Sequence, residues 1–71
     1  MKYIVIELQT DASGNVANIV TKKDTLNEAE ALFHQILASA AISSVPVHAA
    51  VILNNYGDVQ DVKSYVHPPE G

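Results

Sequence analysis

Two segments of the chain carry hydrophobic residues on both sides of a predicted strand. The first segment covers residues 2–9, with Ile4, Ile6 and Leu8 on one side and Tyr3 and Val5 on the other. The second segment, residues 46–54, has a similar hydrophobic run. An antiparallel strand with one face in water alternates hydrophobic and polar positions instead. We therefore expect both faces of these two strands to be covered.

Turn signals define two further strands. The cluster 10–15 is rich in Asp, Ser, Gly and Asn and predicts a hairpin turn, so residues 16–23 form the return strand. The sequence Asn-Asn-Tyr-Gly-Asp at 54–58 predicts a second hairpin, with residues 59–67 as the fourth strand. The prolines of segment 68–71 cannot donate to a sheet, and we expect a flexible tail there.

The middle of the chain predicts an amphipathic helix. Thr25 followed by Glu28 forms a capping-box pattern. Hydrophobic residues then recur at steps of three and four, at Leu26, Ala29, Leu32, Phe33, Ile36, Leu37 and Ala40. This spacing places them on one stripe that packs on a sheet. Pro46 disfavours helical geometry at the preceding residue, so we expect the helix to end by Ile42 or Ser43.

The predicted element order is ββαββ, in a single α+β domain of residues 1–67. Because edge strands are generally more polar than central ones, we expect a four-stranded antiparallel sheet with strand order 2-1-3-4 and the helix across one face. The end with the helix N-terminus then gathers Lys2, Lys22, Lys23 and the 54–58 turn. The opposite end gathers Ser43, Ser44, His48, His67 and the 11–15 turn.

The small size of the chain, 71 residues, predicts self-association. A single core of this size stabilises by only about 3 to 5 kcal/mol. There is no cysteine, which excludes disulfides and thiol catalysis and fits a reducing compartment. We expect a homo-oligomer, at least a dimer, because Tyr3, Val5 and their counterparts on the third strand need cover that one helix cannot provide.

The charge of the chain argues against a nucleic-acid partner. The net charge is −4, with four lysines and no arginine, whereas phosphate backbones are normally met by clustered Lys and Arg. No hydrophobic stretch is long enough for a signal peptide or a membrane span, so we expect neither secretion nor a membrane partner.

A second stripe runs along the helix, formed by Asn27, Glu30, Ala31, His34, Ala38 and Ala41. In one interpretation this stripe faces solvent, and Glu30 and His34 make a weak surface pair. In the other, the alanines let a neighbouring subunit approach closely, and Glu30 and His34 line a pocket between subunits.

Ser43, Ser44 and His48 follow the helix, where loops on a rigid scaffold often carry binding groups. We favour a structural interpretation, in which the serines satisfy helix carbonyls or the turn itself and His48 is a partly exposed strand residue. No acid stands at a spacing that would orient a Ser–His pair for nucleophilic attack. We therefore predict no catalytic residue and no enzyme activity.

Lys22 and Lys23 precede the helix N-terminus, where free N–H groups favour phosphate. Asp24 and Glu28 compete for those N–H groups and repel an anion.

The three histidines lack the spacing of zinc ligands, so we predict no metal and no cofactor.

The residues around the helix and its exit form a recognisable pattern: Asp24, Thr25, Asn27, Ala29, Glu30, Phe33, His34, Leu37, Ala38, Ala40, Ala41, Ser43, Ser44, Pro46 and the run 48–50. Together with the opening residues 1–7, this pattern resembles a family of short hypothetical proteins encoded by phages and prophages of Gram-positive bacteria. The resemblance extends to about Tyr65. The family usually has Tyr-His at the aromatic-His pair, whereas this chain has Phe33-His34.

Small phage oligomers with pockets between subunits include the Sequestin and Lockin families, which sequester the cyclic or histidine-linked ADP-ribose signals of Thoeris immunity. The resemblance implies a non-catalytic binding protein of that type in the cytoplasm of the bacterial host. The base or ribose of its ligand would meet Ser43, Ser44 and His48, with His34 contributed from the helix. Its phosphates would meet backbone N–H groups, hydroxyls, histidine, or Lys22 and Lys23 from a neighbouring subunit. The alternative is a structural or protein-binding phage accessory protein without a small-molecule ligand, whose hydrophobic sheet face docks onto a partner.

Overall fold

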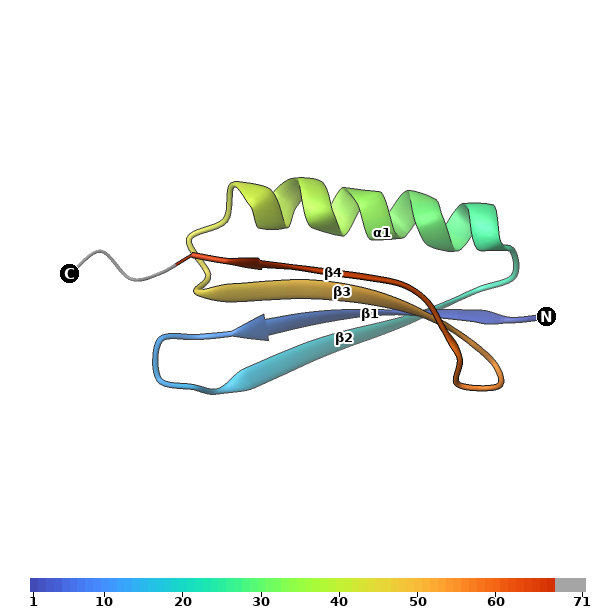
Figure 1. Ribbon diagram of the computed structural model, residues 1–71, viewed down its shortest axis with the longest axis horizontal. Coiled ribbons are helices and arrows are strands. Elements are labelled where there is room, and N and C mark those ends of the chain that lie inside the picture. The colour runs from blue at the N-terminus through green and yellow to red at the C-terminus, as the bar shows by residue number, and fades with distance from the viewer. Residues whose placement is uncertain (68–71) are drawn as a thin grey trace.

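The computed structural model describes residues 1–67, which form two layers, a helix and a sheet (Figure 1). The elements are β1 (Tyr3–Thr10), β2 (Val16–Lys23), α1 (Leu26–Ala41), β3 (Val47–Asn54) and β4 (Val59–Val66). Neighbouring strands are antiparallel in the order β2-β1-β3-β4. The predicted α+β fold and strand order are confirmed, with small shifts at the ends of the elements. The predicted tail, residues 68–71, lies outside the described residues.

Local hydrogen bonds explain where α1 begins and ends. The Thr25 hydroxyl accepts the Glu28 N–H at 3.2 Å and donates to the Glu28 carboxylate at 3.0 Å. In a reciprocal capping box, the Glu side chain accepts the backbone N–H of the cap residue. Here the Glu28 side chain bonds to the Thr25 hydroxyl instead. At the other end, the Ile42 and Ser43 N–H groups still reach carbonyls of the last turn, after which the chain turns into β3.

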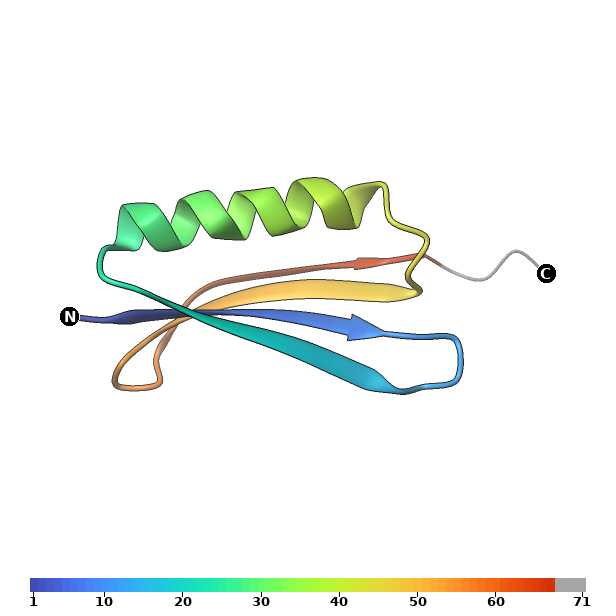
Figure 2. The same cartoon turned by 180° about the vertical axis from the view of Figure 1, so that it is seen from behind.

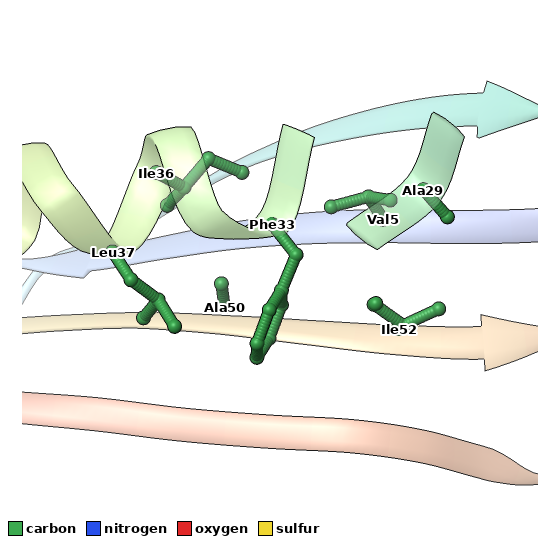
Figure 3. Packing of buried hydrophobic residues seen from close by; sticks show 7 residues of the cluster. All are labelled: Val5, Ala29, Phe33, Ile36, Leu37, Ala50 and Ile52. Carbon is green, nitrogen blue, oxygen red and sulfur yellow. The ribbon is translucent and has the colours of Figure 1, made fainter. Parts of the chain in front are cut away.

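One side of α1 packs on one face of the sheet (Figure 3). The buried helix residues are Ala29, Phe33, Ile36, Leu37 and Ala40, and the buried hydrophobic strand residues are Val5, Ala50 and Ile52. Phe33 is 2% exposed and lies above β3 between Ala50 and Ile52. The small side chain of Ala50 leaves space for the aromatic ring. Because the buried helix residues all belong to the predicted hydrophobic stripe, this stripe is the side of α1 that forms the core.

The predicted position of the uncovered face is wrong. Val5 is only 1% exposed, and Tyr3 packs against the same core, because α1 covers their side of β1. Their neighbours on the third strand, Ala50 and Ile52, are fully buried for the same reason. The face without a helix is the other one (Figure 2).

We call this second side of the sheet the open face. The strand register aligns its side chains in four rows across the sheet: Lys22–Ile4–Leu53–Val59, Val20–Ile6–Val51–Val62, Asn18–Leu8–Ala49–Ser64 and Val16–Thr10–Val47–Val66. The valines on the edge strands, Val16, Val20, Val59, Val62 and Val66, are 55% to 66% exposed. Hydrophobic residues therefore form a continuous surface, and most of its polar positions lie at the edges.

The two hairpins close with the same loop geometry. The Asp11 carboxylate accepts the N–H groups two and four residues ahead at 2.8 and 2.9 Å, and the Gly14 N–H donates to the Asp11 carbonyl at 3.0 Å. The Asn54 amide oxygen makes the equivalent bonds at 2.9 and 3.0 Å, and Gly57 takes the place of Gly14. Gly14 and Gly57 have φ angles of 88° and 86°, which favour glycine.

Candidate functional site

The helix C-terminus, the start of β3 and the end of β4 lie at one end of the molecule (Figure 1). The backbone N–H of His67 donates to the Pro46 carbonyl at 2.7 Å, which fixes the end of β4 beside the helix exit. Lys22 lies at the opposite end, where β2 leads into α1. The predicted separation of polar groups into two ends therefore holds within one chain.

His48 is the buried member of a polar network on the covered face, in which Glu7 and Gln9 are half-buried. Its side chain is 5% exposed, and its Nε2 lies 2.6 Å from Glu7 Oε2, which also accepts the Gln9 amide at 2.9 Å. Because a carboxylate oxygen accepts hydrogen bonds, we assign the proton to Nε2 of His48. The remaining ring nitrogen, Nδ1, is buried and has no hydrogen-bond partner within residues 1–67.

The burial of His48 corrects the expectation of a partly exposed strand residue. Position 48 shares its side of β3 with Ala50 and Ile52, so it faces α1. Glu7 and Gln9 were not anticipated, although Gln9 pairs with His48 in the sheet register and Glu7 lies diagonal to it. An enclosed imidazole with one nitrogen bonded to a carboxylate fits a structural role beneath the helix.

Alternate residues of β4 and its extension form a surface that leads to this end, with Lys63 exposed and Tyr65 and His67 half-buried. Lys63 Nζ lies 5.1 Å from the centroid of the Tyr65 ring. The rings of Tyr65 and His67 are parallel within 5°, with centroids 6.4 Å apart. His67 Nε2 lies 2.8 Å from the Ala40 carbonyl and must donate to it, which leaves Nδ1 as an acceptor. We call Lys63, Tyr65 and His67 the β4 row.

The β4 row was missed by the sequence analysis, although its signal is simple. Residues two apart on a strand share a face, so Lys63, Tyr65 and His67 are expected on one side of β4. Tyr65 also pairs with His48 in the strand register and packs against the hydrophobic core beside the polar network. The row therefore adds an aromatic surface and a cation to the predicted site.

The serines at the helix exit differ in their surroundings. Ser43 is half-buried, and its hydroxyl accepts the Val45 N–H at 3.0 Å. This bond supports the turn, as the structural interpretation predicts. Ser44 is exposed, so its hydroxyl is accessible to a ligand at the same end of the molecule.

Glu30 and His34 lie away from this end. His34 is exposed on the outer side of α1 and meets the Phe33 ring edge to face, with ring centroids 5.6 Å apart. No ion pair joins Glu30 to His34 in the described part of the chain. Within one chain, Ser43, Ser44 and His48 all lie near the helix exit, with His48 buried and Ser44 exposed. Glu30 and His34 lie on α1, and Lys22 lies at the opposite end of the molecule.

The end that carries the helix N-terminus is occupied by a surface ion pair. Lys2 donates to Asp24, and this contact holds the pKa of the Asp24 carboxyl below its usual value. The Lys2 backbone N–H also donates to the Asn55 side chain at 2.9 Å. An anion at this end would have to compete with the Asp24 carboxylate for Lys2.

Residues 1–67 contain neither a metal-binding cluster nor a membrane-spanning helix. No group of three or more His, Asp or Glu residues there is arranged to hold a metal ion. Within the same residues, no helix has the length and hydrophobicity needed to cross a membrane. Comparisons with protein families, curated proteins and solved structures found no match to the chain.

Proposed function

We propose that the protein is a non-catalytic, oligomeric binding protein that sequesters a nucleotide-derived signal of the cyclic ADP-ribose or histidine-linked ADP-ribose type. It would be encoded by a phage and act in the cytoplasm of the infected bacterium. The resemblance of the sequence to small phage proteins suggests the ligand class. The observation that supports it is the row of Lys63, Tyr65 and His67, which reaches the helix exit through the contact of His67 with the Ala40 carbonyl.

The chemistry of this end matches the parts of such a ligand. Aromatic rings such as those of Tyr65 and His67 provide stacking surfaces for a nucleobase. The Lys63 ammonium beside Tyr65 supplies a positive charge for a phosphate, and Nδ1 of His67 offers an acceptor to a ribose hydroxyl or an adenine amino group. The exposed Ser44 hydroxyl adds a donor and an acceptor.

Titration calorimetry with cyclic ADP-ribose and with histidine-linked ADP-ribose tests the proposal. We expect one of them to bind, and Lys63→Ala to weaken binding by about tenfold, since one charge-assisted hydrogen bond is lost. Lys2→Ala is the matched control, because it removes the same charge at the opposite end. Absence of binding to both ligands overturns the proposed ligand class.

Lys22→Ala distinguishes two ways of neutralising the phosphates. Lys22 lies at the far end of the same chain, so only a neighbouring subunit could bring it to the ligand. A loss of affinity with Lys22→Ala but not with Lys63→Ala would assign the phosphates to the subunit boundary. The reverse result would assign them to the β4 row.

A second candidate function is a protein-binding or structural accessory role without a small-molecule ligand. The open face favours this role, because large exposed hydrophobic patches mark interaction surfaces. Native mass spectrometry of protein purified from cells that produce the nucleotide signals separates the two candidates. A retained small molecule supports sequestration, and assemblies without ligand support the accessory role.

A further inference from the structure

We infer that the open face packs against the open face of a second copy of this chain, giving a two-fold dimer with both helices on the outside. This pairing rests on the proposed function in one respect, because it specifies how the proposed oligomer forms. It does not depend on which ligand the oligomer binds. In a single chain, Val20 and Val62 are 55% and 61% exposed at the two ends of one row. Ile6 and Val51 lie between them in the register.

The size of the open face is sufficient for a stable interface. Its four strands have eight residues each. At about 3.3 Å per residue and about 4.8 Å per strand, the face covers about 500 Å². Two copies together therefore bury about 1,000 Å², which reaches the minimum expected of a specific interface. The helix cannot supply this cover, because it lies on the other side of the sheet (Figures 1 and 2).

The arrangement of polar residues suits a second copy. Asn18 and Ser64 lie on the edge strands, so a dimer would bury a hydrophobic centre and leave these side chains at the rim. Within residues 1–67, Lys22 is the charged residue of this face, and it occupies one corner. A two-fold axis between the sheets, along or across the strands, places the two Lys22 side chains at different corners. Like charges therefore do not meet.

The chemistry of other occupants fits less well. A membrane surface with anionic lipids attracts clustered basic residues. The chain has a net charge of −4, and Lys22 is the basic residue of the open face. Two aliphatic sheets, in contrast, pack face to face at about 10 Å and form a sandwich. The hydrophobic side chains of both open faces then form one core between the two copies.

The oligomeric state in solution tests this pairing. Sedimentation analysis of the wild-type chain at about 10 µM should give twice the mass of one chain, for a dissociation constant near or below about 1 µM. Val62→Glu should shift the protein to the monomer with an unchanged far-UV circular dichroism spectrum. Val62 lies on an edge strand and is mostly exposed in a single chain, so its substitution tests pairing more than folding.

Two further variants make the test decisive. Val20→Glu places the same charge at the other end of the row, on β2, so a local folding defect on β4 cannot be mistaken for dissociation. Ala38→Glu is the matched control on the exposed outer side of α1 and should leave the dimer intact. A wild-type monomer at about 100 µM overturns the pairing and leaves the open face to a different protein. A dimer that survives both valine substitutions but not Ala38→Glu also overturns it and assigns the contact to the helices.

Discussion

The face of the sheet under α1 and the open face carry different kinds of side chains. The covered face combines a hydrophobic core around Val5 and Ile52 with the polar network of Glu7, Gln9 and His48. The open face carries aliphatic residues on all four strands. The face that a single chain buries is thus the more polar of the two.

This difference shows what each face can tolerate. Glu7 and Gln9 can lie half-buried under α1 because the Glu7 carboxylate bonds to both His48 and Gln9. Aliphatic side chains have no such compensation in water, so their exposure costs about 25 cal/mol for each Å². A chain whose exposed face is the more hydrophobic one fits an assembly in which both faces are covered.

The largest expected effect comes from the centre of the covered face. Phe33→Ala should lower the free energy of unfolding by about 3 to 5 kcal/mol, because it leaves a cavity between α1 and β3. Because a core of this size stabilises a single chain by a similar amount, we expect the variant to lose most of its folded circular dichroism signal before urea is added, and a urea titration of the wild-type chain gives the reference. His34→Ala, at the adjacent exposed position, is the control and should change the stability by less than about 0.5 kcal/mol. Similar losses for both would mean that the two stripes of the helix are wrongly assigned.

The polar part of the covered face should matter less than its hydrophobic part. Glu7→Ala removes the acceptor of both His48 and Gln9, and we expect a loss of about 1.5 to 3 kcal/mol, as for hydrogen bonds to charged groups. Glu30→Ala, which removes a carboxylate from the helix, should have a much smaller effect. An equal loss for both variants would show that the Glu7–His48 contact adds nothing to stability.

The two faces also differ in how far the sequence predicts them. Period-two patterns, turn clusters and the helical stripe predict all elements and their order, because each signal is local. The side that α1 covers could not be predicted, since β1 is hydrophobic on both sides and only tertiary packing selects Val5 over Ile6. The role of Ser43 in its turn was predicted from local hydrogen bonding. The contact of His67 with Ala40 joins residues 27 positions apart, and no local pattern reports it.

The open face can be tested by the dependence of stability on protein concentration. If two open faces pair, folding is linked to association, and a tenfold increase in concentration should stabilise the folded dimer by about 1.4 kcal/mol. The thermal unfolding midpoint of the wild-type chain should therefore rise with concentration. Val62→Glu should show a midpoint that does not change, and a constant midpoint for the wild-type chain would contradict the pairing.

The smallest expected effect lies outside both faces, in the loop that joins β1 and β2. Hydrogen bonds from the Asn15 backbone and side chain hold the pKa of the Asp11 carboxyl below its ordinary value of 3.8. A lowered folded-state pKa means that the ionised carboxylate stabilises the fold above the unfolded-state pKa. This contribution is lost as the pH falls through the folded-state pKa.

The second hairpin supplies the control for this acid effect, because Asn54 makes the same loop bonds as Asp11 and does not titrate. Asp11→Asn should therefore preserve the loop geometry while removing its dependence on pH. We expect the wild-type chain to be the more stable of the two at about pH 7 and this difference to be smaller at about pH 2.5, because the ionised carboxylate of Asp11 progressively loses its stabilising effect as the pH falls below 3.8. Urea titrations at both pH values measure this difference. The pKa of Asp24 is also lowered by its contact with Lys2. This contact is present in both the wild-type chain and Asp11→Asn, so its contribution cancels in the stability difference between them. A stability difference that is the same at both pH values would show that the charge of Asp11 does not contribute to closing the hairpin.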